Sequence, residues 1–403
     1  MPPAGRPPRG PAPAARPASS RAEPPRTGPP HPAERPAEPS SLTGLSLAGL
    51  EALFRELGEP AYRAAQVFRL VWREGVTDPE RMTTLSKALR TRLAAAVRPD
   101  ATTVVEAEES HDGTVKLLLG LADGARVETV LIPEADRRTV CVSTQVGCPI
   151  RCTFCASGVG GLVRNLSVAE IAEQVLHAQR RLGARPTNIV IMGMGEPLLN
   201  LPALAAALAL WSDPAGMDFG ARRITVSTAG TAPMVDRLGE LDLGVNLAIS
   251  LHGADDETRR RLVPTSPEGR VQDLVDAAAR YARKSGRDVT VEYVLIEGQN
   301  DSAEQAEALA RLLVGRHIHV NLIPLNPVSH RPDLKAPSGL ASKAFSRRLR
   351  EAGVFTHLRS RRGDDIHAAC GQLALERSLS GGPPPPIPDR PAAAPPGASP
   401  PPA

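Results

Sequence analysis

Long apolar runs are missing from this sequence. No stretch of about 18 or more consecutive apolar residues occurs, which excludes a predicted helix that crosses a membrane. The first residues include arginine but no apolar segment, which excludes a typical secretory signal. We therefore expect a cytoplasmic protein with no membrane partner.

Aromatic residues and net charge are also low. Phe, Trp and Tyr make up only 3% of the chain, so contacts to unstacked bases would depend on arginine more than on aromatic rings. The net charge of +4 is weak evidence for a nucleic-acid partner. Three basic runs are either nucleic-acid contacts or solvated faces: Arg259–Arg261, Arg347 with Arg348, and Arg359 with Arg361 and Arg362.

Cysteine is scarce, with five residues in the chain. In a reducing compartment this number excludes a structural disulfide framework and favours metal binding or catalysis. The positions are Cys141, Cys148, Cys152, Cys155 and Cys370.

Proline, in contrast, is abundant, with 41 residues. Residues 1–41 and 379–403 are rich in proline and have no apolar periodicity, so we expect two disordered tails. Between them we expect a helical domain at 42–100 and a larger α/β domain at 101–378, which opens with a β-rich segment.

Apolar spacing predicts the local structure of the two domains. Residues 46–98 have the spacing of amphipathic helices. Short apolar runs at 102–105, 115–119 and 127–132 then predict strands, with Asp-Gly turns at 112–113 and 123–124.

From Thr139 onward, strand and helix patterns alternate. Ser167 and Glu170 form a capping box that predicts the start of one helix. Such alternation is typical of a parallel sheet with right-handed crossovers, and we predict an open, incomplete (β/α)6 barrel. Its strands are expected at 140–143, 189–192, 224–227, 245–250, 289–296 and 318–323.

Small and polar residues follow four of these strands. In a β/α barrel the carboxyl ends of the strands carry function, so these turns predict a binding site on one rim. The turns are Gly193–Pro197, Thr228–Gly230, Leu251–Gly253 and Pro324–Pro327. The first is not a G-x-G-x-x-G motif, so it does not predict a dinucleotide site.

Cys148, Cys152 and Cys155 have C-x3-C-x2-C spacing in the loop after the first predicted barrel strand. Three thiolates hold three irons of a [4Fe–4S] cluster and leave one iron open, whereas an electron-transfer cluster uses four cysteines. An open iron binds S-adenosylmethionine (SAM), and this spacing is the radical SAM signature. A zinc site, with Cys141 or Cys370 as fourth ligand, is the alternative.

Further motifs, in order, resemble the RlmN/Cfr family of radical SAM RNA methyltransferases over residues 45–377. They are Val127–Val130, Cys141–Cys148, the cysteine triad, Arg164–Leu166, Met192–Leu198, Ser227, Ser250–His252, Asn326 with Pro327, and Ala369–Leu373. The resemblance is strongest to the RlmN branch, which modifies carbon 2 of adenine. It implies that residues 42–100 are an accessory domain associated with RNA.

The resemblance also implies a role for each leftover cysteine. Cys370 would be methylated by one SAM, and a radical from a second SAM would take hydrogen from that methyl group. The carbon radical would then add to the adenine, giving a protein–RNA adduct. Cys141 would resolve the adduct through a disulfide with Cys370, and Glu128 would accept the proton from the adenine carbon.

The same resemblance implies the cofactors and partners. They are one [4Fe–4S] cluster per chain, two SAM molecules per turnover, 23S rRNA, tRNA as a second substrate, and an external electron donor; we expect a monomer. The implied SAM contacts are Gly195, Glu196, Ser227, Ser250, Leu251, His252 and Asn326. Ser266 and Glu268 depart from the family pattern, which bears on local RNA contacts or loop geometry and not on the radical chemistry.

Two alternatives remain open at this stage. One is carbon-8 methylation of adenine, as in the Cfr branch. The other belongs to a different class, a non-catalytic iron–sulfur or zinc protein that binds RNA, and it would not need Cys370.

Overall fold

The computed structural model describes residues 41–264, 269–359 and 362–373. The predicted tails and the departing loop positions Ser266 and Glu268 lie outside the described residues, apart from Ser41. Within the described ranges, no helix is both long and apolar enough to cross a bilayer.

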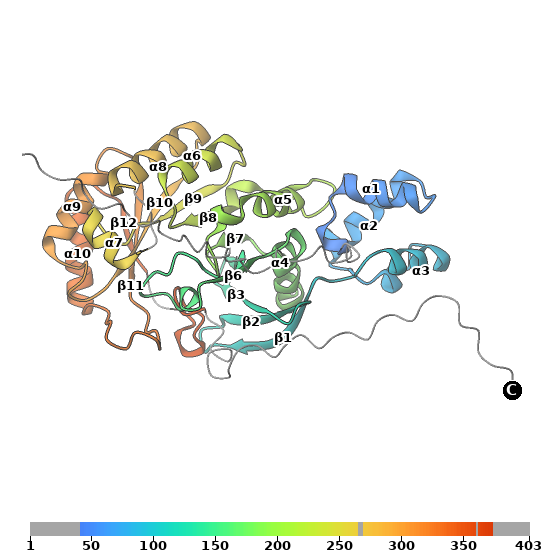
Figure 1. Ribbon diagram of the computed structural model, residues 1–403, viewed down its shortest axis with the longest axis horizontal. Coiled ribbons are helices and arrows are strands. Elements are labelled where there is room, and N and C mark those ends of the chain that lie inside the picture. Colours follow the sequence, from blue (N-terminus) through green and yellow to red (C-terminus); the bar gives the residue numbers. More distant parts are fainter. Residues whose placement is uncertain (1–40, 265–268, 360–361, 374–403) are drawn as a thin grey trace, which may run out of the picture. The chain divides into compact units, whose positions relative to one another are not determined.

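The predicted helical segment contains three α-helices, drawn in blue tones in Figure 1: α1 (Leu47–Glu56), α2 (Ala61–Glu74) and α3 (Lys87–Ala96). The Ser86 side chain accepts a hydrogen bond from the Leu89 N–H and begins α3. Gly75, at φ +70°, ends α2 in the left-handed conformation. Phe54 and Trp72 are fully buried between these helices and their surroundings. The position of a domain boundary near residue 100 stays a prediction.

Ten strands of the described chain form one sheet, in the order β1-β2-β3-β4-β7-β8-β9-β10-β11-β12. Neighbours from β1 to β4 are antiparallel, and neighbours from β4 to β12 are parallel. The predicted α/β fold with an incomplete (β/α)6 barrel is confirmed. The predicted strands are β1 (Thr102–Glu109), β2 (Val115–Leu121), β3 (Arg126–Pro133), β4 (Arg138–Cys141), β7 (Asn188–Ile191), β8 (Ile224–Thr228), β9 (Asn246–Ser250), β10 (Val289–Leu295) and β11 (His319–Pro324).

Two features of the sheet were not predicted. The β-rich segment continues the barrel sheet, because β3 pairs with β4. Three further strands are too short to give an alternating pattern, and β6 exposes successive apolar side chains; they are β5 (Gln145–Gly147), β6 (Leu162–Asn165) and β12 (Thr356–Leu358).

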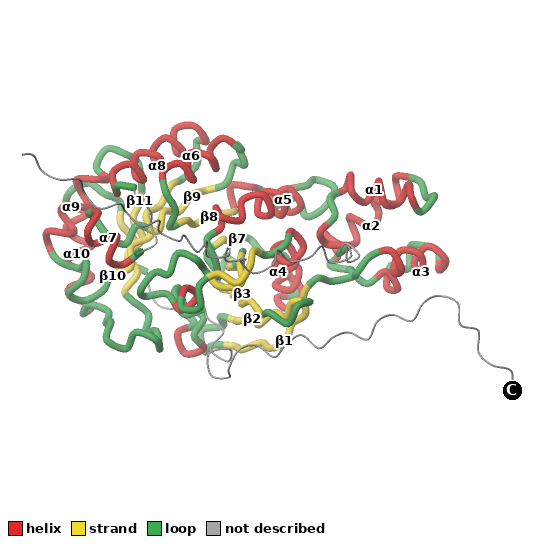
Figure 2. The backbone as a smooth tube through the Cα atoms, viewed as in Figure 1, coloured by secondary structure: helices red, strands yellow, loops and turns green. Residues whose placement is uncertain are grey.

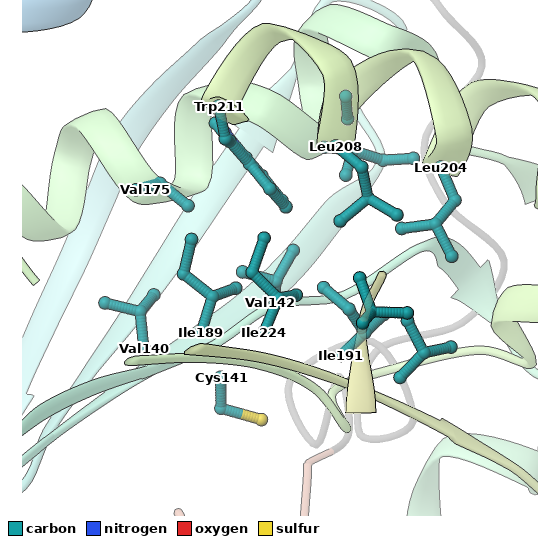
Figure 3. Packing of buried hydrophobic residues seen from close by; sticks show 14 of the residues in the cluster. Val140, Cys141, Val142, Val175, Ile189, Ile191, Leu204, Leu208, Trp211 and Ile224 are labelled. Atoms are coloured by element: carbon teal, nitrogen blue, oxygen red, sulfur yellow. The ribbon is translucent and has the colours of Figure 1, made fainter. Parts of the chain in front are cut away.

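Helices alternate with the parallel strands, as the red and yellow segments of Figure 2 show. Val140 and Val142 point toward the helices that carry Val175 and Trp211, whereas the Cys141 sulfur points to the other side of the strand (Figure 3). Burial of these apolar side chains holds the helices on the sheet. The helices are α4 (Val168–Leu182), α5 (Leu201–Ser212), α6 (Ala232–Glu240), α7 (Asp256–Leu262), α8 (Val271–Ser285), α9 (Ala303–Leu313) and α10 (Gly339–Glu351).

Glu173 of α4 joins the N-terminal region to the sheet. Its carboxylate accepts hydrogen bonds from the Thr43 hydroxyl, from the Ala101 N–H at 2.6 Å and from the Thr102 N–H at 2.8 Å. Burial raises the pKa of Glu173, and these donors oppose the rise. A buried carboxylate is stable only with such donors, so these three segments depend on one another.

Candidate active site

One pocket collects residues from the predicted rim. The three triad cysteines line it together with residues that follow β7, β8, β9 and β11. Of the expected SAM contacts, all but Leu251 line it, namely Gly195, Glu196, Ser227, Ser250, His252 and Asn326. Leu251 is fully buried beside the pocket, and its N–H donates to the Glu292 carbonyl at 3.0 Å.

The small hairpin of β5 and β6 positions the cysteine loop. The Cys148 N–H donates to the Gly161 carbonyl at 2.9 Å. Gly147 has φ +75°, and a Cβ atom there would lie 2.0 Å from the Gly161 carbonyl oxygen, so only glycine fits this close approach. The far end of the loop is tied to the C-terminal segment, because the Ala156 N–H donates to the Gly371 carbonyl at 2.8 Å.

The capping box of α4 supports the same hairpin. Ser167 and Glu170 exchange the two predicted capping hydrogen bonds. Arg164 of β6 forms two hydrogen bonds of 2.9 Å to the Glu170 carboxylate and a third, of 2.6 Å, to Asp123. The start of α4 therefore anchors the strand that returns from the cysteine loop.

The cysteine thiols fit an iron–sulfur cluster. Burial raises the pKa of Cys148 to about 12 and raises the pKa of Cys152 and Cys155, so their thiolates need a cationic partner such as iron. Within the described residues, no three His, Cys, Asp or Glu side chains are grouped to hold a single metal ion. The donor set of three cysteine sulfurs around one pocket suits a cluster that leaves one iron open, whereas a structural zinc site takes four closed ligands.

Glu196 connects two turns of the rim. Its carboxylate accepts hydrogen bonds from the Leu198 N–H at 3.0 Å, the Thr228 hydroxyl at 2.7 Å and the Ala229 N–H at 2.9 Å. Burial raises its pKa, while these donors lower it. The side chain joins the turns after β7 and β8 and lines the pocket.

His252 is neutral in the folded protein. Burial, with the nearby Arg259 charge, lowers its pKa to about 3. Its Nδ1 accepts a hydrogen bond from the Val294 N–H at 3.2 Å, so the neutral ring carries its proton on Nε2. The Phe154 ring lies edge-on at 4.8 Å between centroids and fixes the imidazole orientation.

This neutral histidine predicts a loss of stability in acid. An unfolded histidine binds a proton below about pH 6.5, whereas His252 in the folded state does so only near pH 3. The unfolded state therefore binds more protons in this window, and the free energy of unfolding should fall by about 1.4 kcal/mol per pH unit as pH decreases. Denaturant unfolding followed by circular dichroism between pH 7 and 4 measures this slope. His252→Gln should have a smaller slope, and an unchanged slope would contradict the neutral assignment.

Cys370 and Cys141 lie near one another. Cys370 is exposed and lines the pocket beside the triad. Cys141 is buried, and its pKa is raised to about 12 by burial and by the charge of the nearby Cys370. The Asn326 Nδ2 donates to the Cys370 carbonyl at 3.0 Å and holds that loop over the pocket.

Glu128, the predicted base, does not line the pocket. It is buried on β3, 3.5 Å from the Lys116 Nζ. Lys116 in turn donates to the Ile366 carbonyl at 2.6 Å, four residues before Cys370. Glu128 is thus connected to the segment that carries Cys370, through Lys116.

Three pocket-region residues were not predicted as site residues. Arg259, treated above as part of a basic run, is 3% exposed and donates to the carbonyls of Ser250, Leu251 and Ala229, so it is neither a solvated nor an RNA-facing residue. Glu292 and Arg359 line the pocket. Arg359, like Arg259, was treated above as part of a basic run. Glu292 is a lone charged residue inside a strand and gives no motif, and only alternation along β10 would have placed it on an inner face.

Comparison with known proteins agrees with this geometry. A model of the radical SAM superfamily matches residues 142–313, and a model of the ribosomal RNA large subunit methyltransferase N-terminal domain matches residues 40–98. The probable dual-specificity RNA methyltransferase RlmN of Symbiobacterium thermophilum is 46% identical over 338 residues, which cover 82% of this chain and 90% of that protein. The chain belongs to the RlmN family of radical SAM enzymes.

Other RlmN relatives are similarly close. The dual-specificity RNA methyltransferase RlmN of Syntrophobacter fumaroxidans is 44% identical and matches 84% of this chain and 99% of its own length. The crystal structure of a radical SAM methyltransferase from Sphaerobacter thermophilus is 46% identical, with a TM-score of 0.80, covering 83% of this chain and 99% of that one. The RlmN resemblance is confirmed, and the family implies a [4Fe–4S] cluster and SAM.

Proposed function

We propose that this protein methylates carbon 2 of an adenine in 23S rRNA, and an adenine in a tRNA anticodon loop as a second substrate. The position of Cys370 carries the proposal, because this exposed cysteine lines the pocket of the cluster cysteines and lies near the buried thiol of Cys141. The dual specificity in the names of the RlmN relatives supports two RNA substrates.

Adenine carbon 2 lies between two ring nitrogens and is too electron-poor to attack a methyl sulfonium. The Cys370 thiolate is a competent nucleophile, and it displaces S-adenosylhomocysteine from the first SAM to form a methyl thioether. Cys148, Cys152 and Cys155 would hold the cluster. When bound, the cluster supplies the electron that makes a second SAM a hydrogen-abstracting reagent. Cys370 then presents its methyl carbon to the adenine.

Two further side chains, Glu128 and Cys141, act in the release of the product. Glu128 takes the proton from carbon 2 of the radical adduct, and its connection through Lys116 to the Cys370 segment supports this role. The adduct would return its unpaired electron to the cluster that supplied one, which leaves a closed-shell thioether between Cys370 and the adenine. The Cys141 thiolate then attacks the Cys370 sulfur, so that a disulfide forms and the Cys370 sulfur–carbon bond breaks. The electron pair of that bond stays on the transferred carbon, which takes up a proton and becomes the new methyl group. An external electron donor returns the disulfide to two thiols.

Residues 42–100 are proposed as the accessory domain that associates with RNA, ahead of the catalytic domain at 101–378. The match of the methyltransferase N-terminal model to residues 40–98 supports this division. Arg63 and Lys87 lie on helices of this region, where they suit contacts to phosphate.

Mass spectrometry of RNA from a deletion strain tests the modified carbon. We expect 2-methyladenosine to disappear from 23S rRNA and tRNA, and to return with a plasmid copy of the gene. Loss of 8-methyladenosine instead would assign the carbon-8 alternative. RNA with no methyladenosine change would contradict the proposal.

A biochemical control separates the enzyme from a non-catalytic RNA-binding protein. Protein reconstituted without oxygen, with reductant and SAM, should release 5′-deoxyadenosine. A fully loaded metal site that gives no 5′-deoxyadenosine would exclude the radical enzyme.

A further inference from the structure

Strand β10 lies between two strands that lead to expected SAM contacts, but the family resemblance assigns it none. Its neighbour β9 ends with Ser250, and its other neighbour β11 leads to Asn326. Glu292 of β10 pairs in register with Ser250, is 5% exposed and lines the same pocket. It is therefore placed among the binding residues without a role.

One oxygen of this carboxylate is satisfied and the other is not. Glu292 Oε1 accepts a hydrogen bond from the Asn321 Nδ2 at 2.9 Å. Its Oε2 is buried and has no hydrogen-bond partner within the described residues, and the same holds for Asn326 Oδ1. Leaving a buried acceptor unpaired is costly, so two such atoms in one pocket indicate a ligand that brings N–H or O–H donors.

Burial, a cation and a hydrogen-bond donor all act on the Glu292 carboxyl group. Burial raises its pKa, but the positive charge of Arg359 and the Asn321 hydrogen bond act in the opposite direction. Arg359 also lines the pocket. The unpaired Oε2 is an acceptor that a neutral hydroxyl donor would satisfy.

The position of Cys370 selects the part of SAM that reaches Glu292; this step rests on the proposed function. The Cys370 methyl group must give its hydrogen to the 5′ carbon, so the ribose has to lie against Cys370. Asn326, which donates to the Cys370 carbonyl, lines the same pocket as Arg359 and Glu292, so we expect these side chains to border the ribose. The amino and carboxylate groups of SAM belong at the cysteine triad and Glu196 instead.

We propose that Glu292 positions SAM by accepting hydrogen bonds from the ribose hydroxyls through Oε2. An acidic side chain on a ribose diol is a common way for proteins to hold nucleosides. Strands β8, β9, β10 and β11 would then each contribute to the nucleoside site, with Glu292 as the contribution of β10.

Binding of S-adenosylhomocysteine and its 2′-deoxy and 3′-deoxy counterparts to cluster-loaded full-length protein tests the proposal. For the wild-type protein, removal of the contacted hydroxyl should weaken binding about tenfold or more, because the buried acceptor loses its donor. Glu292→Gln should bind S-adenosylhomocysteine about tenfold more weakly and should no longer distinguish it from the deoxy compound.

The ratio of the affinities for S-adenosylhomocysteine and for its deoxy counterpart distinguishes a ribose contact by Glu292 from a structural role. If Glu292 only balanced the charge of Arg359, the variant would weaken both ligands equally, and an unchanged ratio would overturn the proposal. Iron content and circular dichroism check that Glu292→Gln loads and folds. If it does not, Glu292→Asp, which keeps the charge but withdraws the oxygen, must show a reduced ratio.

A matched control is Glu134→Gln in the neighbouring pocket, where Glu134 pairs with Arg362. It should keep the wild-type ratio. These binding measurements need neither RNA nor turnover. A wrong assignment of Glu292 would therefore change the affinity ratio and not the methylation result, whereas a wrong proposed function would be detected by mass spectrometry of the RNA.

Discussion

Cys370→Ala is expected to eliminate methyl transfer to RNA, by more than about 10⁴-fold, with little change in stability. Alanine has no nucleophile to accept the first methyl group, so no carbon is available for the adenine. Cys370 is exposed, which means that its removal leaves no cavity in the core. The measurement is transfer of a labelled methyl group from SAM, first to the protein and then to RNA.

The matched control is Cys370→Ser, which keeps the shape but not the reactivity of the thiol. At neutral pH a serine hydroxyl without an adjacent base is a far weaker nucleophile than a thiolate, so this variant should be as inactive as alanine. Both variants should retain the iron of the wild type, since the triad is untouched. Labelled methyl on the protein in either variant would place the acceptor elsewhere.

Cys141→Ala is expected to accumulate protein covalently bound to RNA and to lose at least about 100-fold in turnover. Addition to the adenine needs only Cys370, whereas release needs a second thiol that attacks the Cys370 sulfur. Denaturing gels with labelled RNA would show a band of reduced mobility that nuclease removes. The cost to folding is modest, because the substitution removes one small buried sulfur.

The pH dependence of wild-type release gives an independent check of this role. Burial raises the pKa of Cys141 to about 12, so its thiolate is a minor species at neutral pH and becomes more abundant as pH rises. Resolution of the adduct should therefore accelerate with pH between 7 and 9. Normal turnover by Cys141→Ala, without an adduct, would show that another group releases the product.

Much of the fold could be predicted because the chain is regular where it is buried. The strands β7 to β11 are rich in buried apolar residues, which is typical of a parallel sheet, and four of them (β7, β8, β9 and β11) lead into turns of small or polar residues. The capping box at Ser167 marks α4 to the residue. Strand β12 and the β5–β6 hairpin were not predicted, because each strand has only three or four residues and its pairing depends on tertiary neighbours.

Some residues of the candidate site could be predicted from the sequence, and others could not. The cysteine spacing depends on local sequence and so could be recognised, and the resemblance supplied the roles of Cys370, Cys141 and Glu128. Arg259 could not be recognised, because its three carbonyl partners come from two other turns of the rim. Glu292 likewise acquires its meaning only when Ser250 and Asn321 lie on either side of it.

The hydrogen bonds of the Glu173 carboxylate determine which segments can be exchanged between related enzymes in a chimaera. It collects donors from Thr43, before the accessory helices, and from Ala101 and Thr102, after them, while its own helix starts beside the cysteine hairpin. A chimaera that exchanged the accessory helices together with the residues on either side would replace the donors and keep the acceptor. The N-terminal helices should therefore be exchanged together with α4. Such a chimaera keeps the Glu173 carboxylate and its hydrogen-bond donors from the same parent protein.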